Sequence, residues 1–522
     1  MSSKFMFREV FPALLLIFGI AAVIFKILPL GIPFSPDFYF YRTSPWANVN
    51  PAYLFYGIAT AIAAILLPRF HGRIKTYLLV MAVMTLCLIL NMNICRPMAY
   101  SWSFRILYTT DTNLNPFFAK GLSINKISEY PLTHLRKASH GFMGSEKEEN
   151  RLTTHPPGLP VSYALLNKTL NASPSLKNLF RNFALHEKIL TEKEHSEFYA
   201  PAAVSILLCF IALALIPLLV FLIIREMSSE KNALMGAIFS ILVPSFQIFA
   251  PTPNIYFPPL ALLIVYCCLK GLRLRRSATL HVSSGEGFAS SNPAYISSGE
   301  GFASSNPAHN MKSNLFFLLC GILTGLSLFL TFEFLPVLLF CFIFILFQYS
   351  ENKDWLTVRK NILFWACGGL AVYLVYLLCG YDPVKMFFIV MKNNQEFYAW
   401  FKRSYVVSVP FNIIEFCAFS GIACFSIFFV DFFAGIEKIT EWRGLPSAFA
   451  GTLGIVFLLF IFSGSVRGEL ARNCMSFMPL FVITAFAKEL FSEKLFYICG
   501  ILCIIYLIFI SSFIEVFYWF NV

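Results

Sequence analysis

Two short polar segments carry residues that could take part in chemistry. Asp111 lies in the segment YTTDTN, and His155 lies in RLTTHPPGLP. A carboxylate or an imidazole can accept a proton when it stands within hydrogen-bonding distance of a reacting group. Pro156 and Pro157 fix their own φ angles and hold His155 extended, and Gly158 lets the backbone turn sharply. The second segment is therefore predicted to be a rigid corner. Its simpler interpretation is a plain turn with a solvated histidine.

Two short apolar helices are predicted around these segments. The residues after Asp111 that recur at roughly helical spacing are apolar, namely Leu114, Phe117, Phe118, Leu122 and Ile124. They predict a helix lying on the membrane surface, for which Asp111 is a candidate N-cap. The segment LPVSYALLNKTL, residues 159–170, is too short to span a membrane. Two interfacial helices would bring His155 over the surface on which Asp111 stands, although local sequence alone favours the cap.

Four basic residues lie beside the late apolar runs, on the side that is predicted to face outward, where Lys and Arg are otherwise scarce. They are Lys402, Arg403, Arg467 and Arg472. A guanidinium offers two parallel N–H donors to an anion such as phosphate. Contact with lipid headgroups or water is the alternative for each, and for Lys402 it is at least as well supported. A functional role is favoured for Arg472, because Glu469 lies three residues earlier and can orient it on one helical face.

One acidic residue stands where the chain has almost no polar loop. Glu333 lies in LTFEFLP, between two apolar runs. An acid so near a bilayer is costly unless it lines a cavity. We expect Glu333 to bind a polar ligand or a cation in such a cavity, or else to stand in headgroup water. Glu415, at the start of a later run, has the same two interpretations.

The composition sets the surroundings of these residues. The 522-residue chain is 58% hydrophobic and only 13% charged, with a mean hydropathy of +0.70. Soluble domains carry about 25% charged residues, so we expect an all-α polytopic membrane protein. Long unbroken apolar runs argue against a membrane β-barrel. The net charge of +12 lies mainly in short connections, where membrane orientation explains it, so nucleic acid is not an expected partner.

Apolar runs of near-spanning length predict about thirteen transmembrane helices. They lie near residues 9–30, 52–67, 76–94, 199–224, 233–250, 255–270, 314–331, 334–349, 362–380, 411–433, 449–464, 476–489 and 495–513. The first run follows Lys4 and Arg8 and has no clear cleavage site, so it is predicted to be a retained signal anchor. The excess of Lys and Arg in alternate short connections predicts a cytoplasmic N-terminus and an outward C-terminus.

The predicted organisation has five parts. N-terminal spans occupy 1–94, an extracytoplasmic loop with interfacial helices occupies 95–198, and further spans occupy 199–270. A cytoplasmic insert at 271–313 separates them from a C-terminal bundle at 314–522. The insert contains a tandem duplication, VSSGEGFASSNPAY followed by ISSGEGFASSNPAH. Small polar residues without an apolar face predict disorder, and a protein-interaction tether is the alternative.

Taken in order, these motifs resemble the GT-C superfamily of membrane glycosyltransferases, which includes protein O-mannosyltransferases and aminoarabinose transferases. The resemblance rests on YTTDTN, THPPG, FKRSYVVSVPFNIIEF and VRGELARNCMSFMPL, and it covers about residues 76–513. It is closest to a bacterial branch that carries HPPG. A bundle of this type would have its large loop and its active site outside the cytoplasm, which implies a bacterial inner or plasma membrane.

The resemblance implies transfer of a sugar from a polyprenyl-phosphate donor to a lipid, glycan or protein acceptor. Asp111 would accept the proton of the acceptor hydroxyl. His155, Glu333 and the four basic residues would bind substrate, with cations stabilising the departing lipid phosphate. Asn254, in APTPNIYFPP, stands where many members have an acidic residue, and an amide binds a metal weakly. The donor is the only cofactor-like molecule implied, and no residue is assigned to a metal.

Two other classes of function fit the composition. A transporter or flippase of an amphiphilic substrate should show charged residues or broken helices deep within its spans. Few such features are visible in the sequence, and a large outward loop suits an enzyme better. A non-catalytic membrane protein of the same fold is the third reading, which the amide at Asn254 leaves open.

Overall fold

The computed structural model describes residues 3–27, 39–41, 82, 115–142, 152–186, 198–250, 252–284, 307–352, 354–436, 444–468 and 470–516. The regular secondary structure of these residues is helical apart from two three-residue strands, β1 (Tyr39–Tyr41) and β2 (Ile514–Val516), which pair antiparallel with Tyr39 opposite Val516. Short 3-10 helices are labelled η. The remaining elements are α1 (Ser3–Ile24), α5 (Pro116–Leu122), α6 (Tyr130–Ala138), η3 (Leu152–Thr154), α7 (Gly158–Asn171), α8 (Pro174–His186), α9 (Tyr199–Met227), α10 (Glu230–Ser240), α11 (Pro244–Ile248), η5 (Pro253–Tyr256), α12 (Phe257–Ser284), α13 (Pro307–Leu330), η7 (Phe332–Phe334), α14 (Leu335–Asn352), α15 (Trp355–Leu378), α16 (Pro383–Trp400), α17 (Tyr405–Ser420), α18 (Ile422–Ile436), α19 (Leu445–Ser463), α20 (Leu470–Asn473), η9 (Met475–Phe477), α21 (Met478–Ala487) and α22 (Glu493–Phe513).

Within the described part of the chain, six helices are long and apolar enough to cross a membrane. They are Tyr199–Met227, Pro253–Arg275, Asn310–Leu330, Trp355–Leu378, Leu445–Ser463 and Glu493–Phe513. This confirms the helical class and fits an integral membrane protein. The predicted spans 52–67 and 76–94 lie outside the described residues, apart from residue 82. The total of about thirteen spans therefore stays a prediction.

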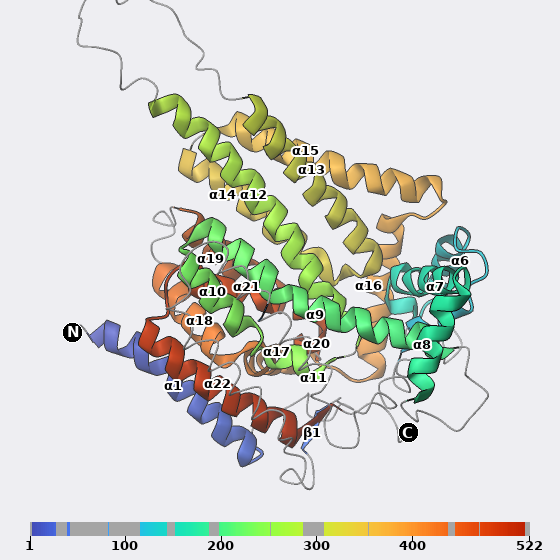
Figure 1. Cartoon of the computed structure of the whole chain (residues 1–522), viewed down its shortest axis with the longest axis horizontal. Coiled ribbons are helices and arrows are strands. Elements are labelled where there is room, and N and C mark those ends of the chain that lie inside the picture. Colours follow the sequence, from blue (N-terminus) through green and yellow to red (C-terminus); the bar gives the residue numbers. More distant parts are fainter. Residues whose placement is uncertain are drawn as a thin grey trace, which may run out of the picture.

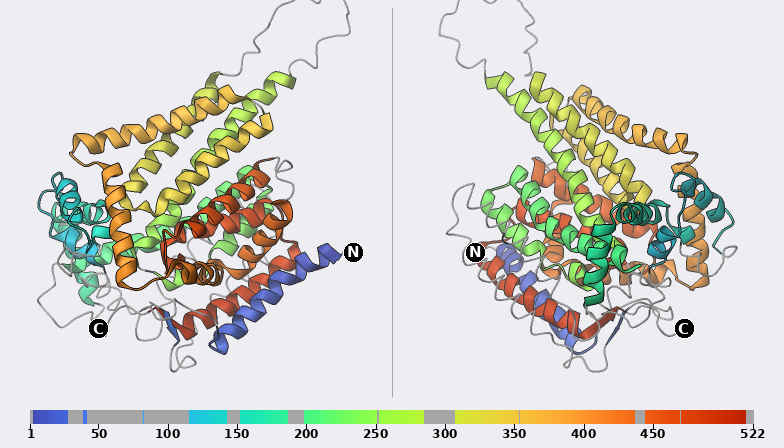
Figure 2. Two further views of the ribbon diagram at one scale, coloured as in Figure 1. Left: turned by 180° about the vertical axis from the view of Figure 1, so that it is seen from behind. Right: turned by 45° about the vertical axis from the view of Figure 1, so that its right-hand side comes forward.

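The long helices are arranged in groups that Figures 1 and 2 show from three sides. Helices α12, α13, α14 and α15 run alongside one another, α1 lies beside α22, and α9 passes between the two groups. Glycines allow the closest of these approaches, between α13 and α15. A Cβ on Gly321 would overlap the carbonyl oxygen of Trp365, and one on Gly368 would overlap that of Leu318. Small residues at such crossings let helix backbones touch.

Two predicted spans are broken in the structure. The segment 233–250 divides into α10 and α11, because Pro244 has no N–H to continue a helix. The segment 411–433 divides into α17 and α18 at Gly421. Its φ of +98° is a backbone conformation that glycine adopts readily and other residues rarely adopt. The two breaks meet, since the Oγ of Ser245 donates to the carbonyl oxygen of Phe419 at 2.9 Å. The prediction of one continuous helix in each segment was wrong.

Charged side chains join the helices at the end of the bundle that carries the insert. Glu226, buried at the end of α9, accepts from Lys270 and Arg273 of α12, both at 2.7 Å. Arg275 donates to amide oxygens on α13 and α15. Helix α12 continues to residue 284 and α13 begins at 307. The predicted disordered insert at 271–313 was therefore too long, and residues 285–306 lie outside the described part.

The predicted loop region gathers at the opposite end. Helices α6, α7 and α8 lie beside α16 and the first turns of α9 (Figure 1). A small apolar core joins α6 to α16, formed by Leu135, Ala138, Tyr381, Met386 and Val390. Hydrogen bonds reinforce it, because Glu396 accepts from the backbone N–H of Phe142 at 2.9 Å. Helix α16 thus holds the loop region against the bundle.

Candidate functional site

A cavity of about 410 Å³ opens where the loop region meets the bundle. Its walls come from the start of α5, the corner between η3 and α7, the paired turns η5 and η7, helix α16, and the segment between α19 and η9. Five of the predicted substrate-binding residues line this cavity, namely His155, Asn254, Glu333, Arg403 and Arg472. Segments more than 300 residues apart in the chain thus bring these side chains together.

The corner at residues 154–158 shapes one wall. The ring of His155 meets the ring of Phe117 edge-on, with centroids 5.0 Å apart. Its Nδ1 lies 3.0 Å from the Oγ1 of Thr154. Pro156 lines the cavity beside it. The alternative of a freely solvated histidine is wrong, because His155 is only partly exposed and packs into this wall.

The close approach of two backbones explains the glycine after the prolines. Gly158 begins α7, and a Cβ at this position would overlap the carbonyl oxygen of Phe329 at the end of α13. Gly121 of α5 has the same role, since its Cβ would press on Tyr163. These contacts hold α5, α7 and α13 together and keep the corner at the cavity.

The paired turns at the ends of α12 and α13 present an acid and an amide. The Nδ2 atom of Asn254 donates to both carboxylate oxygens of Glu333, at 3.3 Å each. The N–H of Glu333 donates in turn to the Oγ1 of Thr331, at 3.3 Å. Glu333 therefore lines a cavity, which was expected if it binds a ligand and does not stand in headgroup water. Burial, with the nearby charges of Glu333 and Glu415, raises the pKa of the Cys474 thiol, which stays protonated.

The segment that carries Arg472 is fixed by buried polar side chains of α17. Asn412 donates to the carbonyl oxygen of Val466 at 2.8 Å and accepts from the N–H of Gly468 at 3.1 Å. Glu415, 2% exposed, accepts from the N–H of Ala471 at 3.0 Å. Glu415 is thus used to hold the backbone beside Arg472 and does not line the cavity.

The remaining predicted cations differ in their positions. Arg403, 5% exposed, lines the cavity and donates to the carbonyl oxygen of Arg467 at 2.9 Å. Arg467 returns a bond to the carbonyl oxygen of Arg403 at 3.2 Å and lies over the ring of Tyr398. Lys402 is exposed, in a turn with φ of +51°. Arg467 and Lys402 are not among the residues that line the cavity.

Two predicted residues cannot be placed. Asp111 and Glu469 lie outside the described residues. The expectation that Asp111 caps the following helix was wrong, however, because α5 begins at Pro116 and its N-cap is Asn115. The Oδ1 of Asn115 accepts from the N–H of Phe118 at 3.3 Å. Asn115 also lines the cavity.

Helix α16 supplies cavity residues that the sequence reading missed. Met391, Asn394, Phe397 and Tyr398 all line the cavity from this helix. The sequence did contain a start signal for this helix, because Asp followed by Pro is typical of a helix N-terminus. In the structure Asp382 is the N-cap and accepts from two N–H groups of the first turn, and Pro383 is the first helical residue. Buried Asn393 on the same helix donates to the carbonyl oxygens of Ala138 and Thr153, both at 3.0 Å.

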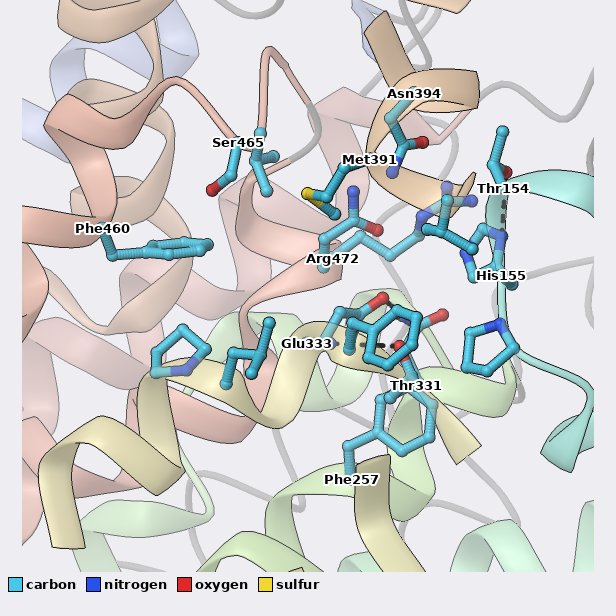
Figure 3. A pocket seen from close by; sticks show the side chains of 18 of the residues that line it. Thr154, His155, Phe257, Thr331, Glu333, Met391, Asn394, Phe460, Ser465 and Arg472 are labelled. Atoms are coloured by element: carbon cyan, nitrogen blue, oxygen red, sulfur yellow. Dashed lines mark hydrogen bonds between the residues drawn. The ribbon is translucent and has the colours of Figure 1, made fainter. Parts of the chain in front are cut away.

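The end of the cavity at Phe460 is mainly apolar, with Ser465 beside it, and the rest carries both polar and apolar side chains. Figure 3 shows His155 at one end, Phe460 at the other, and Glu333 and Arg472 between them. The first turns of α14 and the last turns of α19 supply part of the apolar lining, with Leu335, Pro336, Leu339, Val456, Leu459 and Phe460. Other walls supply the rest, with Phe117, Leu159, Phe257, Phe332, Phe387, Val390, Met391 and Phe397. Among the described residues, no group of three or more His, Cys, Asp or Glu side chains is arranged to hold a metal ion.

Comparison of the chain with protein-family models, with curated proteins and with solved structures finds no match. The order of the sequence motifs and the geometry of this cavity are therefore the features that bear on function.

Proposed function

We propose that this protein is an integral membrane glycosyltransferase that moves a sugar from a polyprenyl-phosphate donor to an extracytoplasmic acceptor. The observation that carries the proposal is the meeting of His155, Asn254, Glu333, Arg403 and Arg472 in one cavity with an apolar end. His155, Glu333, Arg403 and Arg472 stand out in the sequence by residue type and position, and Asn254 by the resemblance to GT-C enzymes. Such a cavity suits a molecule with a charged head and a hydrocarbon tail.

The polarity of the cavity orients the donor. The donor phosphate would lie against Arg472, with Arg403 nearby, because guanidinium groups bind phosphate through charge-assisted hydrogen bonds. The isoprenoid chain would lie along Leu459 and Phe460. The sugar would then lie between Glu333, which accepts hydrogen bonds from hydroxyl groups, and the wall formed by His155. The acceptor lipid, glycan or protein is not specified by these residues.

Asp111 is the proposed base. It precedes Asn115, a cavity residue, by four positions, and four extended residues span at most about 14 Å. Its carboxylate would take the proton of the acceptor hydroxyl while that oxygen bonds to the anomeric carbon. The bond between the anomeric carbon and the phosphate oxygen breaks at the same centre. The polyprenyl phosphate leaves as an anion, which Arg472 stabilises.

The test is a turnover assay of the purified protein in lipid with a panel of polyprenyl-phosphate sugars. We expect Asp111→Asn to lower turnover about 10²–10⁴-fold with unchanged donor affinity. We expect Arg472→Ala to weaken donor binding by roughly 10–100-fold, the equivalent of about 1.5–3 kcal/mol. Lys402→Gln is the matched control, because Lys402 carries the same charge outside the cavity. Equal turnover in wild type, Asp111→Asn and Arg472→Ala would refute the assignment.

One observation favours a second candidate, a transporter or flippase for an amphiphilic substrate. The breaks between α10 and α11 and between α17 and α18 touch each other, and meeting broken helices are typical of carrier proteins. The contact itself is uncharged, because it joins the hydroxyl of Ser245 to the carbonyl oxygen of Phe419. Movement of a labelled polyprenyl phosphate across proteoliposome membranes, without any transfer of sugar, would support this second function instead.

A further inference from the structure

Helix α16 forms one wall of the central cavity, the cavity at which the loop region meets the bundle. Its lining residues recur every three or four positions, so they form one face of the helix. They are Phe387, Val390, Met391, Asn394, Phe397 and Tyr398. The hydroxyl of Tyr398 already donates to the carbonyl oxygen of Ser465 at 2.9 Å. Asn394 is therefore an amide within a face that is otherwise apolar and aromatic.

Two adjacent asparagines of α16 are used differently. Asn393, 1% exposed, donates to the carbonyl oxygens of Ala138 and Thr153 and so holds the loop region. The side chain of Asn394 is partly buried and makes no hydrogen bond within the described part of the chain. Figure 3 shows its amide directed into the cavity. A polar group in an apolar face costs free energy unless a partner satisfies it, and here that partner comes from the cavity.

Two further amides line the same cavity with groups that the fold does not use. Asn473 is the last residue of α20, and its side chain makes no hydrogen bond to any other described residue. Asn115 is 2% exposed and uses its Oδ1 to cap α5, whereas its Nδ2 has no acceptor among the described residues. Three elements that are distant in sequence thus present uncharged donors and acceptors to one space.

We propose that Asn394, together with Asn473 and Asn115, binds the hydroxyl groups of an uncharged sugar and determines specificity for it. A side-chain amide both donates and accepts, as a hydroxyl group does. A carboxylate on the sugar would instead lose its water against uncharged amides, and Glu333 in the same cavity would repel it. The inference rests on the proposed function and adds to it the class of sugar and the residue that selects it.

The experiment measures the affinity of the full chain in nanodiscs for polyprenyl phosphate, polyprenyl-phosphate glucose and polyprenyl-phosphate glucuronic acid. We expect glucose to tighten binding about tenfold relative to polyprenyl phosphate alone, and glucuronic acid to give no such gain. Asn394→Ala should remove most of the gain from glucose and leave the affinity for polyprenyl phosphate unchanged. Asn182→Ala, on the exposed surface of α8, is the matched control and should retain the gain. An amide that is merely hydrated would contribute nothing to this gain.

A second variant tests specificity directly. Asn394→Asp should bind polyprenyl-phosphate glucosamine more tightly than wild type and the glucose donor more weakly, because a carboxylate pairs with the ammonium group. A residue with a purely structural role would change both affinities alike. A gain from glucose that survives Asn394→Ala, or a glucuronic acid donor bound as tightly as the glucose donor, would overturn the inference. Binding of polyprenyl phosphate alone would then leave the proposed donor standing, whereas wild type that binds none of these ligands would refute both proposals.

Discussion

The side-chain amide of Asn254 donates to both carboxylate oxygens of Glu333, at 3.3 Å each. The two residues lie 79 positions apart and belong to η5 and η7, the turns that precede α12 and α14. The amide thus fixes the direction of the carboxylate at the middle of the central cavity. An acid at position 254 would face Glu333 at the same distance.

Asn254→Asp should therefore destabilise the protein more than Asn254→Ala. Removal of the amide donor costs about 1.5–3 kcal/mol, because the lost bond is to a charged group. The aspartate adds repulsion between two carboxylates in contact. Thermal denaturation in detergent at pH 8 measures the order of stabilities. A variant with Asp as stable as wild type would show that Glu333 does not depend on this amide.

The glycine of the proline corner allows a second prediction. Gly158→Ala places a Cβ against the carbonyl oxygen of Phe329 and must push α7 away from α13. We expect a loss of about 1–3 kcal/mol in stability, with loss of donor binding as the wall at His155 moves. Gly500→Ala in α22 is the control, because a Cβ there meets nothing within 4 Å. It should be neutral or stabilising. Equal melting temperatures for the two variants would contradict the account.

Asn393 offers a third prediction, on the wall of the central cavity that carries Thr154 and His155. It is 1% exposed and donates from one nitrogen to the carbonyl oxygens of Ala138 and Thr153. Asn393→Ala leaves two buried acceptors without their donor, at about 1–3 kcal/mol. Asn393→Asp should cost more, because its carboxylate faces those same oxygens. Hydrogen exchange at residues 138–142 and 152–155 should rise in both variants. Unchanged protection there would show that α16 does not hold this wall.

The charged end of the bundle gives a prediction on pH. Asp354 caps α15, and hydrogen bonds from Thr357 lower the pKa of its carboxyl. A lowered folded-state pKa means that this stabilisation is complete above the ordinary value of about 3.9 and is lost as pH falls through the folded value. Asp354→Ala should cost about 1 kcal/mol at pH 7 and progressively less below pH 4. A cost that stays constant down to pH 3 would exclude the carboxylate as the source.

The sequence predicted five polar or charged residues of the central cavity, and three of them break simple rules. His155 precedes two prolines, Glu333 stands where an apolar run has no loop, and Arg472 is a cation on the side that is predicted to face outward. Each feature is costly unless the fold uses it, so each could be found without a structure. Lys402, like Arg403, is a cation on the side that is predicted to face outward. The structure separates the two because adjacent residues in a turn point in different directions.

Other parts of the fold were not visible in the pattern of apolar residues. Helix α16 has an ordinary mixture of polar and apolar residues, and its role depends on contacts with α6 and η3 that are distant in sequence. The breaks at Pro244 and Gly421 fall within continuous apolar runs, where hydropathy alone predicts one helix. Their single proline and glycine were the available signals.

The most direct measurement is the structure of the protein with a polyprenyl-phosphate sugar bound. The account predicts the phosphate at Arg472, the sugar between Glu333 and His155, and the first isoprene units along Leu459 and Phe460. Asp111 should then stand within hydrogen-bonding reach of an acceptor hydroxyl placed at the anomeric carbon. A donor bound elsewhere, or with its phosphate remote from Arg472, would contradict the central claim.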